Sequence, residues 1–280
     1  MSDSFALAAA ELRALDRDRY AASLMVSGEH RAAVQSIYAF AAEIAAIRER
    51  VSEPGPGEIR IQWWVDALEG EGHGAIAANP VADALFRTLE TYGLPAGPLV
   101  RLLAARRFDL YNDPMPDLGQ FEGYAGETVS VLHQYAAMIL AGGTVDEAAD
   151  AAGHLGVASA LTGHLRAFGY NAARGQLYLP LAIFTAHGVR EADIYAGAKS
   201  PQLTAALDQV VDLAREHVGK AQAALSHLDS DLRPALCALA LVKADLKVSH
   251  TIVADPFTPH PAPSAFSRLW ALTWWMLRGR

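Results

Sequence analysis

The stretch YAFAAEIAAIRERV, residues 38–51, decides how the rest of the chain is interpreted. Alanine and other apolar residues fill most of it, and charged residues then follow abruptly. Alanine is the strongest helix former, so this composition predicts a helix. Residues four apart share a helix face, so Ala45 and Glu49 point to one side and Ala46 and Arg50 to the neighbouring side.

A second stretch, LTGHLRAFGYNAARGQLYLP at residues 161–180, has the composition of a partner. Ala167 and Asn171 lie four apart and share a face wherever this stretch is helical. Carboxylates at such spacing on facing helices can hold Mg²⁺, which in turn binds a diphosphate. We expect the two stretches to line one pocket, where few carboxylates remain.

The remaining sequence predicts an all-α fold in a single domain, residues 1–280. Valine and isoleucine are scattered among alanine and leucine at helical spacing, and there is no internal repeat or long linker. Thr144 with Glu147 three residues later predicts a capping box. Loops rich in glycine and proline, such as 52–57, should separate the helices. We place the helices at 5–26, 29–50, 58–69, 80–92, 97–110, 117–141, 145–166, 181–186, 191–197, 201–228, 231–252 and 264–278.

Composition and charge exclude several classes of protein. The net charge of −8 opposes nucleic-acid binding, because phosphate recognition requires a basic surface. Cys237 is the only cysteine, so neither an intrachain disulfide nor a cysteine-based zinc site can form. The N-terminus does not read as a signal peptide, and no apolar run is long enough to span a bilayer. We expect a cytoplasmic protein, or one bound peripherally at the inner face of the cytoplasmic membrane.

Common catalytic and nucleotide-binding motifs are absent from the sequence. It contains no HExxH, GxSxG, GxGxxG or GxxxxGK[ST]. The histidines are spread singly, and the spacing of ten between His154 and His164 does not make a metal pair. We therefore predict polar or capping roles for the histidines.

Four segments resemble successive motifs of the squalene/phytoene synthase family. They are YAFAAEIAAIRER, IQWWVDAL, FEGYAGETVSVL and NAARGQLYLP, and the resemblance covers roughly residues 17–246. It implies a single-domain, isoprenoid-synthase-like helical bundle with a central cavity. In that family, two aspartate-rich motifs on facing helices bind Mg²⁺ and prenyl diphosphates, which are joined head to head.

The chain departs from this family pattern at the metal site. The positions that match the family's aspartates are Ala45, Ala46, Glu49, Ala167 and Asn171, and only Glu49 is acidic. Alanine offers no ligand to a cation that requires several hard oxygen atoms. We therefore expect no metal and no cofactor, with Mg²⁺ required only if the protein is active.

The first motif and two further segments, residues 60–64 and 124–128, are similar to a non-catalytic branch of the family. That branch is the mitochondrial complex I assembly factor of squalene/phytoene-synthase type. The resemblance implies a pseudoenzyme whose partners are complex I subunits or assembly proteins. Two alternatives stay open: an active head-to-head transferase acting on farnesyl or geranylgeranyl diphosphate, and a non-catalytic protein that binds an isoprenoid or lipid ligand.

Four residues are candidates for a pocket that binds an anion: Arg31, Tyr38, Arg174 and Tyr178. Arg174 and Tyr178 match positions near the diphosphate end of the family's site, and an arginine can bind a phosphate group. The competing interpretation is that the arginines anchor loops and that Tyr38 is a core residue. Asp109 is expected to form a local salt bridge with a neighbouring arginine.

The C-terminal segment, residues 264–280, is rich in tryptophan and arginine. A short helix with apolar aromatic residues and flanking arginines is typical of contact with a bilayer surface. The alternative is a helix packed against protein. The residues concerned are Trp270, Trp274, Trp275, Arg268, Arg278 and Arg280.

Overall fold

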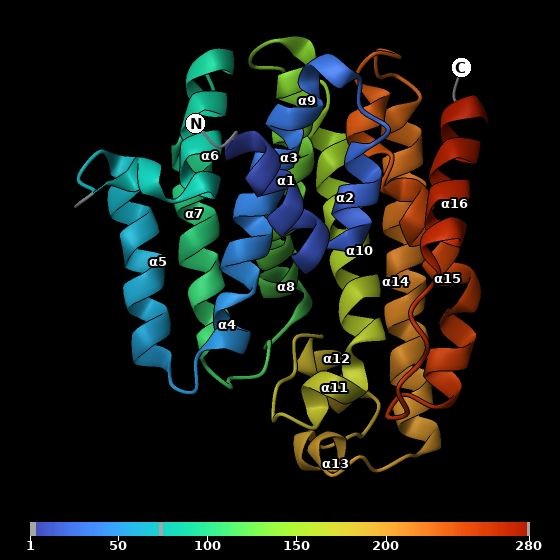
Figure 1. Ribbon diagram of the computed structural model, residues 1–280. Helices are drawn as coiled ribbons and strands as arrows, with labels where there is room; N and C mark the ends of the chain where they lie inside the picture. The colour runs from blue at the N-terminus through green and yellow to red at the C-terminus, as the bar shows by residue number, and fades with distance from the viewer. Residues whose placement is uncertain (1–3, 73–74, 279–280) are drawn as a thin grey trace.

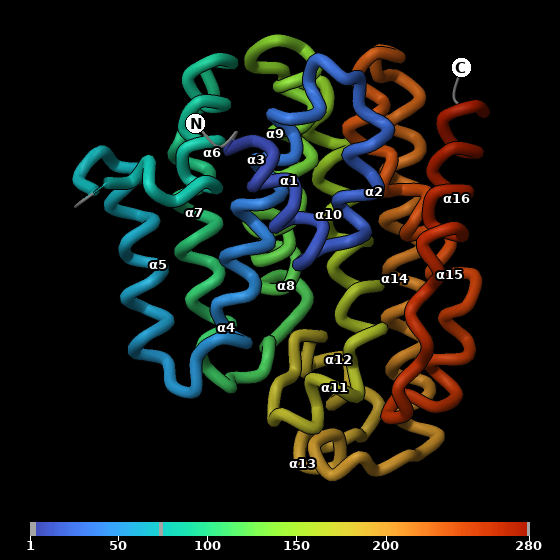
Figure 2. The backbone as a smooth tube through the Cα atoms, in the orientation of Figure 1, coloured from blue at the N-terminus to red at the C-terminus, as the bar shows by residue number. Residues whose placement is uncertain are grey.

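The computed structural model describes residues 4–72 and 75–278, and every regular element within these ranges is a helix. Figures 1 and 2 show the long helices standing side by side, with three short helices gathered at one end of the bundle. The first half of the chain forms α1 (Ser4–Leu15), α2 (Arg17–Ser23), α3 (Gly28–Ala45), α4 (Ile47–Arg50), α5 (Pro54–Glu69), η1 (Ile76–Ala78), α6 (Pro80–Tyr92), α7 (Gly97–Arg106) and η2 (Arg107–Leu110).

The second half of the chain supplies the remaining helices and the short cluster. It forms α8 (Leu118–Ala125), the π-helix η3 (Gly126–Ser130), α9 (Val131–Ala141), α10 (Ala149–Arg166), α11 (Phe168–Ala172), α12 (Leu181–Ala186), α13 (Glu191–Tyr195), α14 (Pro201–Leu225), η4 (Arg233–Leu236), α15 (Leu239–Ala254) and α16 (Ala265–Arg278). The predicted all-α fold is thereby confirmed.

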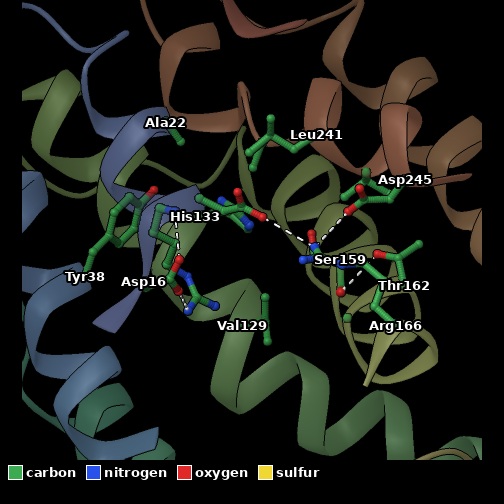
Figure 3. Close-up of a pocket in the computed structure, with 15 residues that line it drawn as sticks. Asp16, Ala22, Tyr38, Val129, His133, Ser159, Thr162, Arg166, Leu241 and Asp245 are labelled. Carbon is green, nitrogen blue, oxygen red and sulfur yellow. Dashed lines mark hydrogen bonds and ion pairs between the residues drawn. The ribbon is translucent and has the colours of Figure 1, made fainter. Parts of the chain in front are cut away.

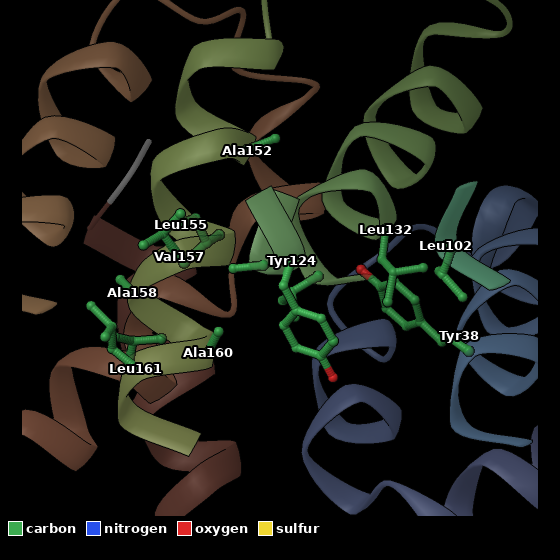
Figure 4. Packing of buried hydrophobic residues seen from close by; sticks show 14 of the residues in the cluster. Tyr38, Leu102, Tyr124, Leu132, Ala152, Leu155, Val157, Ala158, Ala160 and Leu161 are labelled. Carbon is green, nitrogen blue, oxygen red and sulfur yellow. The ribbon is translucent and has the colours of Figure 1, made fainter. Parts of the chain in front are cut away.

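Helices α3 and α10 form the centre of the bundle. Helix α3 packs on α1, α6 and α9, while α10 packs on α14, α15 and η3. Figure 4 shows the small residues Ala152 and Ala160 on the side of α10 that faces Tyr124 and Leu132, and Leu155 and Leu161 on its opposite side. Small residues bring the backbones close together: a Cβ on Gly156 would lie 2.5 Å from the Ser130 Cα. The core is therefore built on close helix contacts, as the alanine-rich sequence predicts.

Local capping signals explain some of the helix boundaries. The Asn79 side chain accepts hydrogen bonds from the backbone N–H groups of Val81 and Ala82, which fixes the start of α6 as predicted. Gly93 ends this helix in the left-handed conformation at φ 60°, which glycine adopts without steric cost.

Several predicted boundaries were wrong. The first predicted helix divides at Asp16, whose side chain caps α2 by accepting from the Arg19 backbone N–H. The second divides at Ala46, between α3 and α4. The 52–57 segment does not break the chain throughout, because α5 begins at Pro54. Proline is tolerated in the first turn, where its missing N–H has no helical partner.

Two further predictions about helix starts were wrong. Thr144 does not cap a helix: α10 begins only at Ala149. The helix predicted at 231–252 is a 3₁₀ turn followed by α15. The region 117–141 is helical as predicted, but it includes one π-helical segment, η3.

Candidate functional site

A cavity of about 280 Å³ lies where the two motif stretches meet. It contains five of the predicted site residues, namely Ala45, Glu49, Ala167, Asn171 and Tyr178. The other residues that line it are Arg48, Arg106, Asp109, Ala160, Gly163, His164 and Gln176. Ala46 is not among the lining residues.

Both motif helices bend at this cavity. Helix α3 ends at Ala45, and Ala46 is the residue between it and α4. Likewise α10 ends at Arg166, and Ala167 precedes α11. Glu49 therefore lies on the short helix α4 and Asn171 on the short helix α11. The side chains that we expected on the faces of two continuous helices lie instead on separate segments around the cavity.

Glu49 is already paired. An Nη2 atom of Arg174 lies 3.3 Å from its Oε2 atom, and the Tyr170 hydroxyl donates to the same oxygen at 2.9 Å. The Arg174 guanidinium also lies over the Tyr170 ring, 5.2 Å from its centroid. Arg174 therefore serves here as the counter-charge of Glu49.

A second carboxylate, Asp109, belongs to a buried network. Arg106 Nη1 lies 2.9 Å from Asp109 Oδ2, and the Tyr124 hydroxyl donates to Oδ1 at 2.7 Å. Arg106 also donates to the Tyr124 oxygen at 2.9 Å. Burial alone would lower the pKa of Arg106, but Tyr124 and Asp109 raise it above its ordinary value. The salt bridge predicted for Asp109 is confirmed, and its partner is Arg106.

Two stacked aromatic rings form part of the cavity wall. The rings of His164 and Tyr178 are stacked with centroids 4.6 Å apart and planes 13° from parallel. Burial, assisted by Arg106, lowers the pKa of His164 to about 3, so the ring is neutral at pH 7. Sequence reasoning missed this role of His164, although its place three residues before Ala167 was a usable signal.

The residues around the cavity do not fit Mg²⁺. That ion prefers near-octahedral coordination by hard oxygen atoms, and Glu49 and Asp109 each already face an arginine. The Nε atoms of Arg48 and Arg106 are buried and have no hydrogen-bond partner in the described ranges. Residues 4–72 and 75–278 also contain no group of three or more His, Cys, Asp or Glu arranged to hold a metal ion. Unpaired guanidinium N–H groups favour an anion over a cation.

Arg31 and Tyr38, which we grouped with this site, lie elsewhere. The Arg31 guanidinium donates to the backbone carbonyls of Leu24 and Val26 and so anchors the loop between α2 and α3. Tyr38 is buried and lines a separate polar cavity of about 210 Å³.

That polar cavity, shown in Figure 3, was not predicted from the sequence. Charged and hydroxyl side chains from four helices enter it, among them Asp16, Arg19, Ser159, Thr162 and Asp245. His133 is buried against it, and its Nδ1 atom has no hydrogen-bond partner among the residues described.

The C-terminal helix α16 has two different faces. Arg268 is 3% exposed and forms ion pairs with Asp245 at 2.7 Å and with Asp18 at 3.1 Å. The prediction that Arg268 flanks a membrane-facing surface was therefore wrong. On the exposed face, Phe266, Trp270 and Trp274 form a stacked row, with successive ring centroids 6.4 and 6.2 Å apart. Arg280 lies outside the described residues.

None of the helices described has the length and apolar character needed to cross a membrane.

Comparison with known proteins relates the chain to one family. A sequence model of squalene/phytoene synthase matches residues 12–262. Complex I assembly factor 6 of Rattus norvegicus is 27% identical over 249 residues, which are 89% of this chain and 74% of the relative. The 15-cis-phytoene synthase of Synechocystis sp. is 26% identical over 244 residues, 82% of this chain and 71% of the relative.

Solved structures show the same fold at low sequence identity. A dehydrosqualene synthase superimposes with a TM-score of 0.80 at 19% identity, covering 98% of this chain and 97% of the other. The squalene synthase HpnC of Alicyclobacillus acidocaldarius gives 0.74 at 19% identity, covering 92% and 95%. The predicted isoprenoid-synthase-like fold is confirmed.

Proposed function

The chain belongs to the squalene/phytoene synthase family, and we propose that it is a member without prenyl-synthase activity that acts as an assembly factor for respiratory complex I. Its similarity to complex I assembly factor 6 extends over 89% of the chain. Its partners are then complex I subunits or other assembly proteins, met at the inner face of the cytoplasmic membrane.

The observation that carries the proposal is the chemistry of the cavity where the motif stretches meet. The positions that match the family's aspartates include Ala45, Ala167 and Asn171, which offer at most one uncharged oxygen ligand between them. The one acidic residue, Glu49, is paired with Arg174. A magnesium ion entering here would have to displace that arginine and would still lack ligands.

A direct enzyme assay tests the absence of catalysis. Purified protein is incubated with farnesyl or geranylgeranyl diphosphate, Mg²⁺ and NADPH, and squalene and phytoene are measured, with a known phytoene synthase run in parallel. We expect no product above background, since metal-ion stabilisation of a leaving diphosphate is hard to replace. Multiple turnovers would overturn this part of the proposal.

A gene deletion tests the assembly role. We expect the deletion strain to lose assembled complex I and NADH:ubiquinone oxidoreductase activity, while succinate dehydrogenase activity, as a control, is unchanged. The wild-type gene and a Glu49→Ala variant should restore complex I equally well, because the role does not depend on metal chemistry at Glu49. Normal complex I in the deletion strain would contradict the assembly role.

The second candidate function is a head-to-head prenyl transferase, and the similarity to the 15-cis-phytoene synthase of Synechocystis sp. favours it. The third is a protein that binds an isoprenoid or lipid and performs no chemistry. The turnover assay above tests the second candidate. Mass spectrometry of organic extracts from the purified protein tests the third, because a stoichiometric lipid without turnover is expected only for the binding protein.

A further inference from the structure

Two histidines far apart in the sequence face each other outside the cavities discussed so far. His154 lies on α10 and His217 on α14, and their Nδ1 atoms are 3.1 Å apart. His217 is buried, whereas the His154 side chain is 28% exposed. The pair is therefore anchored in the core on one side and open to a small ligand on the other.

A carboxylate faces the other nitrogen of each ring. Asp150 Oδ1 lies 3.6 Å from His154 Nε2, and Glu122 Oε1 on α8 lies 3.3 Å from His217 Nε2. Because a carboxylate only accepts hydrogen bonds, Glu122 favours N–H on His217 Nε2, whereas Asp150 at 3.6 Å lies beyond hydrogen-bond distance of His154. A neutral His217 then presents the lone pair of Nδ1 toward His154 Nδ1, and either a proton or a metal ion can lie between the two nitrogens.

We propose that His154 and His217 bind one divalent transition-metal ion of the zinc type through their Nδ1 atoms. A zinc–nitrogen bond is about 2.0–2.1 Å, so two nitrogens on one ion lie about 3.0–3.4 Å apart, which includes the observed distance. Carboxylates that hold the distal N–H of a ligating histidine are the usual second layer of such sites. Imidazole ligands select zinc, copper or nickel over magnesium.

The surroundings leave room for such an ion. A cavity of about 280 Å³ is lined by both histidines, both carboxylates and Ser130. The π-helix η3 forms one wall through Gly126 and Ser130, and π-helical turns are frequent at functional sites. Three ligating side chains do not converge here in the described structure, so the ion would keep water at its other positions.

Nearby charge does not oppose the ion. The two cations nearest to His217 along α14 are already paired, Arg215 with Asp212 at 2.9 Å and Lys220 with Glu216 at 2.7 Å. Asp150 and Glu122 supply two negative charges within reach of the pair. The proposal does not depend on the complex I role, because it concerns a different cavity and a different class of metal.

Zinc titration of the untagged full-length protein tests the site. Isothermal titration with ZnCl₂ should show one ion per chain, and Co²⁺ should give a visible absorption band of nitrogen–oxygen ligation. His154→Gln should weaken zinc binding at least 100-fold, and because the His154 ring is partly exposed, the variant should fold as the parent protein does. Glu122→Gln should weaken it by about 10–100-fold, because it positions a ligand without touching the ion.

Two controls make the result decisive. His227→Gln removes an exposed histidine away from the pair and should leave zinc binding unchanged, and excess Mg²⁺ should not compete. Unchanged zinc affinity in His154→Gln, or no binding in the parent protein, would overturn the proposal. NMR spectra that show a proton shared between the two Nδ1 atoms, which added zinc does not displace, would also overturn the proposal.

Discussion

At the scale of single residues, the carboxylates around the motif cavity are each held by an arginine. Glu49 is paired with Arg174, and Asp109 with Arg106. The two pairs differ in strength, because Asp109 and Arg106 are largely buried and Glu49 is half exposed. An exposed pair contributes about 0–1 kcal/mol, whereas breaking a buried pair costs about 3–5 kcal/mol. Asp109 therefore stabilises the fold, while Glu49 mainly sets the charge of the cavity.

His133 makes the protein sensitive to acid. Burial lowers its pKa from 6.5 to about 4, so the unfolded chain binds a proton between these values that the folded chain does not. The contribution of the neutral His133 ring to the free energy of unfolding is complete above pH 6.5 and is lost as the pH falls to about 4. This contribution is about 3 kcal/mol. Urea unfolding from pH 7 to 4 measures this loss together with a similar loss from His164, whose pKa burial lowers to about 3.

A non-titrating side chain isolates the contribution of His133. We expect His133→Gln to remove roughly half of the acid-dependent loss, because His164 supplies a similar share and remains, even if the variant is less stable at pH 7. His187→Gln, which changes a partly exposed histidine bonded to Gln209, should leave the slope as in the parent protein. Identical slopes in all three proteins would contradict the assignment.

Single residues also show which parts of the site can be predicted from the sequence. Ala45, Glu49, Ala167 and Asn171 lie at one cavity, because their spacing and the family motifs both depend on helix geometry. Arg31 anchors a loop and Tyr38 is buried, as the competing interpretation predicts, and neither lies at the motif cavity. No local pattern tells whether a side chain turns toward a cavity, the core or a loop carbonyl. The His154–His217 pair, 63 residues apart, is visible only in the folded chain.

At the scale of helices, the contact between α10 and η3 depends on one glycine. A Cβ at Gly156 would lie 2.5 Å from the Ser130 Cα and N atoms, which are backbone and cannot move aside. Gly156→Ala should therefore lower the free energy of unfolding by about 1–3 kcal/mol. Chemical denaturation followed by circular dichroism measures the change.

Gly153 is the matched control on the same helix. A Cβ there meets nothing within 4 Å, and alanine is the better helix former. Gly153→Ala should therefore stabilise the protein by about 0.5–1 kcal/mol. Equal effects of the two substitutions would show that helix propensity, and not the contact with η3, governs this position.

The exposed face of α16 permits a second experiment on an element. Phe266 and Trp270 are 77% and 62% exposed, and a row of aromatic rings beside Arg278 is suited to the headgroup region of a bilayer. If α16 contacts lipid, Trp270→Glu should weaken binding to vesicles containing anionic lipid by about tenfold or more. Co-sedimentation measures the binding.

The control for this experiment is Ile59→Glu. Ile59 is 72% exposed on α5, on the opposite side of the bundle in Figure 1. It carries the same change of an exposed apolar residue to glutamate and should bind vesicles as the parent protein does. Equal binding by the Trp270 and Ile59 variants would exclude a lipid-binding role for the aromatic row.

Helix boundaries show why the sequence predicted the elements better than their ends. Asn79 and Gly93 act through local hydrogen bonds and backbone conformation, so both were correct. The breaks at Asp16 and Ala46 occur within segments of good helix-forming composition, and tertiary packing imposes them. The break at Ala46 matters most, because it separates Ala45 from Glu49 and shapes the cavity.

At the scale of the whole molecule, the chain shares the fold of a dehydrosqualene synthase, and we propose that the chemistry of its cavity differs. A TM-score of 0.80 to a dehydrosqualene synthase at 19% identity shows that the helix arrangement tolerates extensive sequence change. Cavities are less tolerant, because a few charges decide which ion is stable inside them. If only the ligands are missing, restoring them should restore metal binding.

A variant with four added carboxylates tests that argument. Ala45→Asp, Ala46→Asp, Ala167→Asp and Asn171→Asp together place oxygen ligands at the positions that we expect to match the family's aspartates, three of which line the cavity. Without a metal, repulsion between these charges should lower the melting temperature. Millimolar Mg²⁺ should raise it again by several degrees, because an ion that binds only the folded state stabilises it.

The parent protein should show no shift with Mg²⁺, since Arg174 already neutralises its single motif carboxylate. Adding Arg174→Gln to the four substitutions should enlarge the Mg²⁺-dependent shift by removing the competing cation. If the five-residue variant folds but Mg²⁺ leaves its melting temperature unchanged, the bends at Ala46 and Ala167 hold the two faces out of register. The shape of the cavity, as well as its missing ligands, would then exclude the metal.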